Sequence, residues 1–271
     1  MSTIDTLVDS AKTDISARIE KLRTDIKAIP PPAPTPTPTP PPPTTNVLLQ
    51  DNFDDPYPFP IGTTSKNGLW LSKYVGSGKV AFENGVLHMV PKTATNYTND
   101  SSGVGYETYA CQVQSKNWFK NFQLDVDMKT NKMLRTGYSK YGVNQQGPQP
   151  WECAWIFFRF TDEQPKSNHH YYFLIRPDHC EFGKKDNKVG DTTVEQQIYL
   201  PRVGDKKLVV GTSNHVTIVS KDNHITITVD GTKIVDYTDT WNDPAKMAQG
   251  LAAMYCEDSD VQFDNMKIVA I

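Results

Sequence analysis

The chain has 271 residues and a formal net charge of −3, with 28 basic and 31 acidic side chains, so it has no broad basic surface. This balance argues against nucleic acid as a main partner. No apolar run approaches the roughly 20 residues of a membrane-spanning helix. The first residues lack the basic and apolar regions of a secretory signal. We therefore expect no membrane span and, for a cellular protein, a cytoplasmic location.

Residues 1–29 predict an amphipathic helix that Ser2 can cap. Its apolar residues recur with a period of eleven, which predicts a straight or slightly right-handed coiled coil. They are Ile4, Val8, Ala11, Ile15, Ile19, Leu22, Ile26 and Ile29. A lone helix of this length is marginal in water, so we expect a homo-oligomer through residues 4–29. The alternative is that the stripe docks on the rest of the chain.

Residues 30–45 form a Pro/Thr-rich segment with ten of the chain's 20 prolines. Proline lacks an amide hydrogen, so this segment predicts an extended polyproline II linker. A docking site for a proline-reading domain is the alternative. The sequence thus predicts three parts: a helix over 1–29, a linker over 30–45 and a head domain over 46–271.

The sequence of the head domain predicts an all-β fold. Apolar and polar residues alternate over 122–129 and 225–230, as in half-buried strands. Asn84-Gly85 and Asp230-Gly231 are typical of tight hairpin turns. The runs AWIFFRF (154–160) and YYFLI (171–175) are apolar on both faces, which indicates central strands. Two antiparallel sheets in a jelly-roll sandwich satisfy this pattern.

The four cysteines, Cys111, Cys153, Cys180 and Cys256, form no CxxC pair and lie in apolar contexts. Such residues usually behave as small buried hydrophobes. We therefore predict buried free thiols, with a disulfide framework as the alternative.

Several segments, in order, resemble the concanavalin A-like lectin/glucanase jelly rolls over about residues 47–271. They are LLQDNFDD, FENGVLHM, NFQLDVDMK, WIFFRFTDE, HHYYFLIRPD, NHVTIVSKDNHITITVDGTKIVDY and VQFDNMKIVAI. That superfamily includes laminarinase-type glycosidases, laminin-G modules, polysaccharide lyases and 3-keto-disaccharide hydrolase-like domains. The resemblance implies the fold but not the activity, because this fold hosts lectins and enzymes alike.

Laminarinase-type enzymes carry Glu-x-Asp-x-Glu on a central strand, where paired carboxylates cut the glycosidic bond. The strand that should hold them, His169–Arg176, contains no carboxylate. The segment most similar to this pattern contains Gln123, Asp125 and Asp127, and we interpret these residues as the polar face of a strand. Retaining glycosidase chemistry is therefore disfavoured.

The resemblance and the aromatic content indicate a glycan-binding groove. Its candidate ligand-binding residues are Trp151, Trp155, Arg159, His169, Tyr171 and Arg176. Arg159, His169 and Tyr171 are also the groups that a polysaccharide lyase would use. A purely structural role for these residues is the third alternative.

Related jelly rolls often hold a structural calcium ion between the first and last strands, which implies oxygen ligands. By this resemblance Asp264 would supply a carboxylate, and carbonyls would come from Gly85 and from near Asp51 or Asn52. The alternative is that Asp264 hydrogen-bonds the first strand without a metal.

We therefore expect a non-catalytic, lectin-like display protein whose head binds a polysaccharide or other glycan. The layout of helix, linker and head resembles that of virion surface proteins. The alternatives are a polysaccharide lyase or other carbohydrate-active enzyme on the same jelly roll, and a structural capsid or surface protein.

Overall fold

The computed structural model describes residues 3–27, 46–94, 108–135, 148–161, 169–188, 191–241 and 247–271. The chain divides into two compact units, residues 1–44 and 45–271. The predicted linker over 30–45 lies outside the described residues. No helix in the described ranges is long and apolar enough to cross a membrane.

The first unit contains one helix, α1 (Thr3–Lys27), as predicted. Its apolar stripe is exposed: Val8, Ile15, Ile19 and Leu22 have exposed fractions of 45%, 57%, 48% and 63%. Helix formation is confirmed, whereas pairing with other copies stays a prediction.

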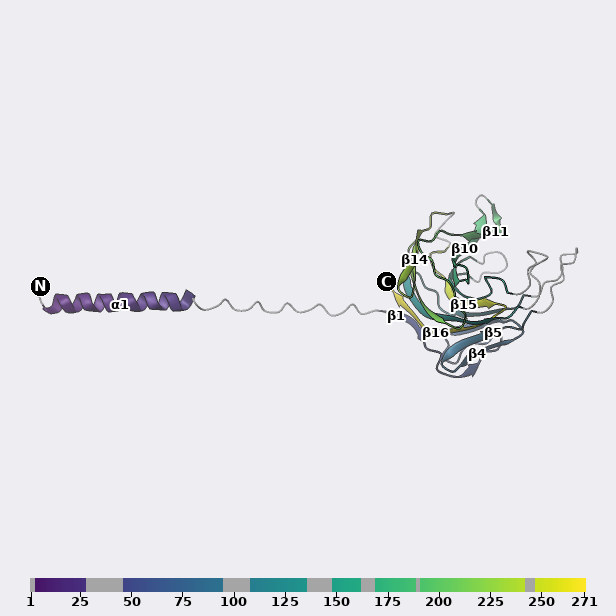
Figure 1. The fold of residues 1–271 in the computed structure, drawn as a ribbon, viewed down its shortest axis with the longest axis horizontal. Helices are drawn as coiled ribbons and strands as arrows, with labels where there is room; N and C mark the ends of the chain where they lie inside the picture. Colours follow the sequence, from purple (N-terminus) through teal and green to yellow (C-terminus); the bar gives the residue numbers. More distant parts are fainter. Residues whose placement is uncertain are drawn as a thin grey trace. The chain divides into compact units, whose positions relative to one another are not determined.

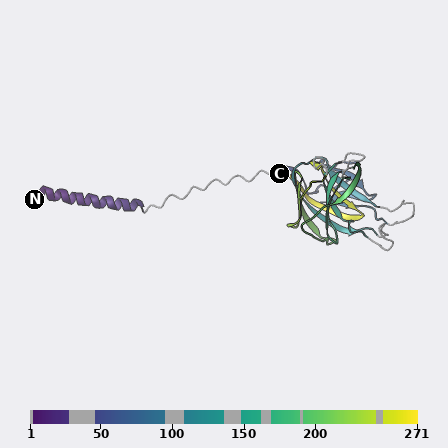
Figure 2. The same cartoon turned by 90° about the horizontal axis from the view of Figure 1, so that it is seen from above.

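The second unit is a sandwich of two antiparallel sheets, and Figures 1 and 2 show the two layers. Sheet A has the order β14-β13-β12-β7-β16-β5-β4-β2, with β1 also paired to β16, and sheet B has the order β11-β10-β9-β8-β15-β6-β3. In Figure 1, β14, β16, β5 and β4 of sheet A lie around β10 and β15 of sheet B.

The strands of sheet A are β1 (Val47–Asp51), β2 (Tyr57–Pro58), β4 (Lys79–Glu83), β5 (Val86–Val90), β7 (Phe122–Met133), β12 (Ser213–Lys221), β13 (His224–Val229), β14 (Thr232–Thr238) and β16 (Ser259–Ala270). The strands of sheet B are β3 (Trp70–Val75), β6 (Ala110–Ser115), β8 (Ala154–Phe160), β9 (His170–Ile175), β10 (Cys180–Lys188), β11 (Asp191–Tyr199) and β15 (Leu251–Glu257).

Both predicted hairpin turns are confirmed. Asn84 and Gly85 have φ of 54° and 72°, and Asp230 and Gly231 have φ of 47° and 78°. Two successive positive φ values are the conformation that Asn-Gly and Asp-Gly favour, and their twist matches that of the flanking strands. These turns set the register of β4 with β5 and of β13 with β14.

The main core lies between the sheets. Alternate residues of β7, such as Leu124 and Val126, point into it and are fully buried. Strand β8 is buried along its whole length, as its two-sided apolar run predicts. All four cysteines are buried free thiols, as expected.

Candidate functional site

Sheet B buries aromatic residues on the face turned away from sheet A. We call this the aromatic face and define it by Trp155 and Phe157 of β8, His170 and Tyr172 of β9, and Tyr255 of β15. These residues belong to, or contact, a second hydrophobic cluster that is separate from the main core. Central strands with two covered faces thus produce two cores rather than one.

The rings of the aromatic face form a continuous contact chain. The ring centroid of Trp155 lies 5.4 Å from that of Tyr172 and 5.8 Å from that of Tyr255. Phe157 stacks on Tyr255 at 4.8 Å and on His170 at 4.4 Å. Burial, with help from Lys185, lowers the pKa of His170 to about 3, so its imidazole is neutral near pH 7. The face is therefore an apolar platform without a formal charge of its own.

Strand register extends this platform to the edge of sheet B. Tyr74 of β3 pairs with Gln112 of β6, Gln112 pairs with Tyr255, and Tyr255 pairs with Trp155. Paired residues of neighbouring strands share a face, so a glutamine amide lies between two tyrosines. The buried Gln112 amide donates to Gln114 Oε1 over 3.1 Å.

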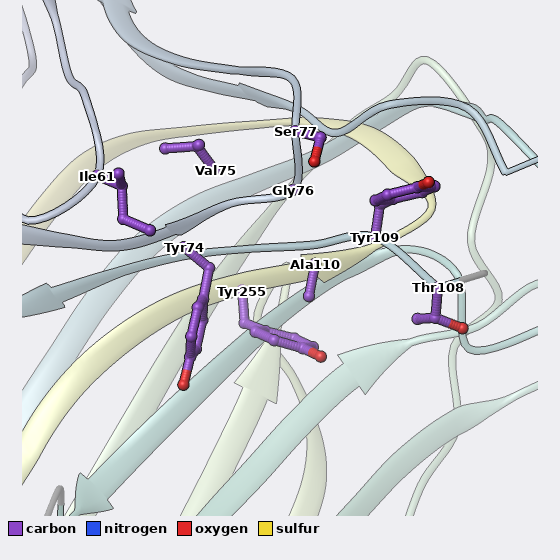
Figure 3. Close-up of a pocket in the computed structure, with 9 residues that line it drawn as sticks. All are labelled: Ile61, Tyr74, Val75, Gly76, Ser77, Thr108, Tyr109, Ala110 and Tyr255. Carbon is purple, nitrogen blue, oxygen red and sulfur yellow. The ribbon is translucent and has the colours of Figure 1, made fainter.

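An open pocket of about 420 Å³ lies at this end of the row (Figure 3). Figure 3 shows the Tyr74 and Tyr255 side chains projecting to the same side of the sheet. Tyr74 is 44% exposed, whereas Tyr255 is partly covered. The other lining residues are Ile61, Val75, Gly76, Ser77, Thr108, Tyr109 and Ala110.

Three carboxylates are connected to the pocket wall through hydrogen bonds. Tyr255 Oη donates to Glu257 Oε1 over 2.6 Å, and burial together with the Glu257 charge raises the pKa of this phenol. The wall residue Thr108 accepts a hydrogen bond from Arg135, which also pairs with the buried Glu152 and Asp258. Burial raises the pKa of Glu152 to about 7 although Arg135 opposes the shift.

Gly183 of β10 makes room for the platform. It pairs with Tyr172, and a β-carbon at position 183 would collide with the Tyr172 ring and hydroxyl. The Tyr172 hydroxyl accepts a hydrogen bond from Gln197 of β11 over 2.9 Å. The glycine thus lets the Tyr172 ring lie flat across the neighbouring strand.

Two predicted ligand-binding residues lie at the aromatic face. Trp155 is part of it, and the half-buried Trp151 packs against the same cluster from the segment before β8. The Trp151 carbonyl accepts a hydrogen bond from Trp155 Nε1 over 2.7 Å.

Arg159 and Tyr171 lie elsewhere. Arg159 has a φ of 50° at a bulge opposite β15, is fully buried, and donates to the carbonyls of Lys120, Asp222 and Met247. Tyr171 points into the main core, where its hydroxyl donates to Asp239 over 2.6 Å. Because both side chains are directed to partners away from the aromatic face, we leave them out of the proposed site.

His169 and Arg176 also face other partners. His169 precedes β9 and is buried, with Nδ1 3.4 Å from Asp186. Arg176 follows β9 and pairs with Asp178 and Glu181. The structure therefore does not bring Arg159, His169 and Tyr171 together with Trp155.

Sequence reasoning missed Tyr74, Phe157, His170, Tyr172 and Tyr255. Two-residue alternation from Trp155 gives Phe157, and antiparallel pairing then gives Tyr172. Tyr74 and Tyr255 share this face because of strand order, which has no local signal in the sequence.

The carboxylates that imitate the glycosidase pattern lie on sheet A. Asp127 accepts from His215 and Asn265, and Asp125 accepts from Thr217 and Gln123. These hydrogen bonds engage both carboxylates, which is typical of a polar strand face.

The residues predicted to bind calcium are partly gathered. Burial and the charges of Asp127 and Asp54 raise the pKa of Asp264, so these carboxylates lie near one another. The Asp54 carboxylate also approaches Gly85. In contrast, the Asp51 carboxylate accepts from Trp70 Nε1 and the Phe53 amide. Carboxylate and carbonyl oxygens are ligands that Ca²⁺ prefers, and Asp54 adds a second carboxylate to the predicted Asp264 and the carbonyls of Gly85 and of the segment near Asp51 or Asn52.

Within the described ranges, no group of three or more His, Cys, Asp or Glu side chains is arranged to hold a metal ion by itself. A calcium ion here would therefore depend on backbone carbonyls as well as on Asp264 and Asp54.

Comparison with known proteins gives one family and a common fold. The family described as 3-keto-alpha-glucoside-1,2-lyase-like domain matches residues 62–269. Among solved structures, SCLam, a non-specific endo-beta-1,3(4)-glucanase from family GH16, is similar at 12% identity and a TM-score of 0.51, over 84% of this chain and 92% of that chain. No curated protein matches the chain.

Two further structures are similar to the chain. A protein with a galectin-like fold from Bacillus subtilis has 10% identity and a TM-score of 0.52, over 83% of this chain and 96% of that chain. LamA from Z. galactanivorans, in complex with laminaritriose and laminaritetraose, has 11% identity and a TM-score of 0.50, over 83% of this chain and 98% of that chain. These matches confirm the predicted concanavalin A-like fold.

Proposed function

Because the chain belongs to the family of 3-keto-alpha-glucoside-1,2-lyase-like domains, we propose that its sandwich unit binds a carbohydrate in the open pocket at the end of the aromatic face of sheet B. The observation that carries this proposal is the row Tyr74, Gln112, Tyr255 and Trp155, which ends in the open pocket. The glucan-related names among the fold neighbours are in keeping with it.

The pocket has the size and chemistry for a sugar. Its volume of about 420 Å³ lies within the roughly 300–1,000 Å³ range of small-ligand sites. The exposed Tyr74 ring and the Tyr255 ring offer apolar surfaces for the C–H face of a pyranose. The Tyr255 and Tyr109 hydroxyls offer hydrogen-bonding partners for sugar hydroxyls.

The test is a glycan array followed by calorimetry with the oligosaccharides that bind. Tyr74→Ala should weaken binding by about 1–3 kcal/mol, the typical loss when a stacked aromatic ring is removed. Trp118→Ala is the matched control, because Trp118 is also an exposed aromatic residue, at 46%, beyond the opposite end of β6. Equal affinity of the two variants, or no binding by the unaltered chain, contradicts the proposal.

A second candidate is the reaction in the family's name, elimination on a 3-keto-glucoside, and the match over residues 62–269 favours it. A base would take the C2 proton, which the C3 ketone acidifies, while the C1–oxygen bond breaks and the departing oxygen takes up a proton. The raised pKa of Tyr255 keeps this phenol protonated near neutral pH. The row of Tyr74, Gln112, Tyr255 and Trp155 supports binding directly, so binding is our first proposal.

Turnover distinguishes the two candidates. Incubation with a 3-keto-α-glucoside should leave the substrate intact if the pocket only binds. Formation of the free aglycone and an unsaturated sugar, abolished by Tyr255→Phe or Glu257→Gln, establishes the enzyme instead. Uronate-containing polysaccharides, assayed for unsaturated products, test the predicted polysaccharide lyase in the same way.

Two further parts of the function remain proposals. Asp264 and Asp54, with the Gly85 carbonyl, would hold a structural calcium ion. The exposed stripe of α1 would join copies of the chain, so that several heads are displayed together. Display on a virion stays a prediction from the layout of the sequence.

A further inference from the structure

Lys184 and Asp239 form a buried ion pair between the two layers of the sandwich. Lys184 belongs to β10 of sheet B, and Asp239 directly follows β14 of sheet A. Lys184 Nζ lies 2.7 Å from Asp239 Oδ2, and both side chains are fully buried. Two groups that are held in contact by a fold react far faster than the same groups on separate molecules. An amine and a carboxyl group in this position can therefore form an amide as well as attract each other.

A second carboxylate lies beside the same nitrogen. Asp186 Oδ2 lies 3.3 Å from Lys184 Nζ, and the Asp186 side chain is 2% exposed. The two residues are two positions apart on β10, so they project to the same face of sheet B. An ammonium group must lose a proton before it can act as a nucleophile. Asp186 is in position to accept that proton as a general base.

The two oxygens of the Asp239 carboxylate have different partners. The Tyr171 hydroxyl donates to Oδ2 over 2.6 Å, and the backbone amide of Trp241 donates to Oδ1 over 2.8 Å. An amide donor at Oδ1 stabilises the negative charge that this oxygen gains when a nucleophile attacks the carboxyl carbon. Oδ2, which Lys184 and Tyr171 both contact, is then the oxygen that departs.

Aromatic rings enclose these polar groups. Lys184 Nζ lies 5.9 Å from the centroid of the Trp241 ring. The ring centroid of Phe182 lies 6.3 Å from that of Tyr171 and 5.8 Å from that of Tyr237. Tyr171 and Phe182 are themselves fully buried. Because amide formation releases water, a site that excludes water favours the condensed product and protects it from hydrolysis.

We propose that Lys184 and Asp239 condense to an amide, and that the ion pair in the structure is the unreacted state. Asp186 accepts a proton from the Lys184 ammonium group, and the nitrogen attacks Asp239 Cγ. The bond between Nζ and Cγ forms, and the bond between Cγ and Oδ2 breaks. Oδ2 leaves as water with two of the three ammonium protons, one of which Asp186 passes on. The third proton stays on the amide nitrogen, so the reaction needs no oxidant, reductant or other reactant.

The new bond would close a loop from residue 184 to residue 239 and fasten sheet B to the end of β14. All four cysteines of the chain are free thiols, so this bond would be a covalent staple that thiol reductants do not break. A cross-link restricts the unfolded chain and thereby stabilises the folded one. The linked chain should therefore unfold at a higher temperature than the unlinked chain, with or without a reductant.

Mass spectrometry of the intact, folded chain tests the proposal. We expect a mass lower than that of the sequence by one water molecule, and a branched peptide that joins residues 184 and 239 in a tryptic digest. Lys184→Met should have the full mass of its sequence. Lys206→Met is the matched control, because it removes the lysine of a more exposed pair with Asp230, and it should keep the deficit.

Three results would overturn the proposal. The first is an unaltered chain with the full mass of its sequence, and the second is a digest without the branched peptide. The third is a deficit that persists in Lys184→Met, because cyclisation at Asp230-Gly231 also releases water but needs no lysine. The digest of the unaltered chain decides the question even if Lys184→Met does not fold.

A separate variant tests the role of Asp186 as the base. Asp186→Asn keeps the shape of the side chain but cannot accept the proton from Lys184. Once circular dichroism has shown that this variant is folded, it should contain at least about tenfold less branched peptide than the unaltered chain prepared alongside it. Equal amounts of branched peptide in the two chains would overturn the role of Asp186.

Discussion

Glu152 is the residue whose burial has the clearest consequence for pH. Its pKa rises from 4.5 to about 7, mainly through burial. The folded chain therefore holds this proton more tightly than the unfolded chain does. This difference in pKa adds to the free energy of unfolding. The contribution is fully present below pH 4.5 and is lost as the pH rises through about 7, a change on the order of 3 kcal/mol.

We expect Glu152→Gln to flatten this pH dependence between pH 5 and pH 8, measured by urea unfolding. Glu83→Gln is the control. Hydrogen bonds from Lys79 and His88 lower the pKa of Glu83, so its contribution has the opposite sign and is lost as the pH falls. Parallel stability curves for the unaltered chain and Glu152→Gln would contradict the expectation.

Arg159 shows why the site was only partly predictable. Residues 155 and 159 lie four apart, so strict alternation puts both on one face of β8. The bulge between them interrupts this alternation and turns Arg159 toward backbone carbonyls. Trp155, before the bulge, lies on the aromatic face, and its role in binding stays a prediction. A bulge depends on the pairing of β8 with β15, and the sequence of β8 alone does not reveal it.

Among the elements, β9, β10 and the segment after β14 share one buried ionic contact. Lys184 of β10 is fully buried, with Nζ 2.7 Å from Asp239 and 3.3 Å from Asp186. Tyr171 of β9 donates to the same Asp239 carboxylate. Removing one member of such a contact leaves a buried charge without compensation.

We therefore expect Lys184→Met to lower the free energy of unfolding by about 3–5 kcal/mol. Lys206→Met, which removes the exposed pair with Asp230, should cost less than about 1 kcal/mol. Chemical denaturation of both variants measures the difference. An equal loss of unfolding free energy in the two variants would contradict the expectation that the buried ionic contact of Lys184 stabilises the fold.

Most elements were predictable because their signals are local. Alternation and the Asn-Gly and Asp-Gly turns predicted β4, β5, β7, β13 and β14 correctly. The order of strands within each sheet has no such local signal, because it depends on contacts between segments far apart in sequence. Only the resemblance to the concanavalin A-like fold pointed to that order.

For the whole sandwich unit, a calcium ion at Asp264 would link the last strand to the first segments. At 100 times its dissociation constant, the ion would stabilise the fold by about 2.7 kcal/mol. We expect Ca²⁺ to raise the unfolding temperature, a chelator to reverse this, and Asp264→Asn to abolish it. Asp178→Asn is the control, and identical melting with Ca²⁺ and with chelator argues against a site.

For the whole chain, joining several heads should change avidity but not affinity. The full chain and a version starting at Thr45, where the second compact unit begins, should bind a soluble oligosaccharide equally. On an immobilised polysaccharide the full chain should bind about 10²–10⁴ times more tightly. Surface plasmon resonance on both ligands measures this, and equal retention on the surface would contradict it.

One margin of each sheet is short or irregular. Sheet A ends at β2, which has two residues and includes Pro58, and β3 at the margin of sheet B is interrupted by a bulge between Ser72 and Tyr74. Short, proline-bearing or irregular margins are poor templates for intermolecular strand addition. These two margins are therefore poorly suited to pairing with a strand of another chain.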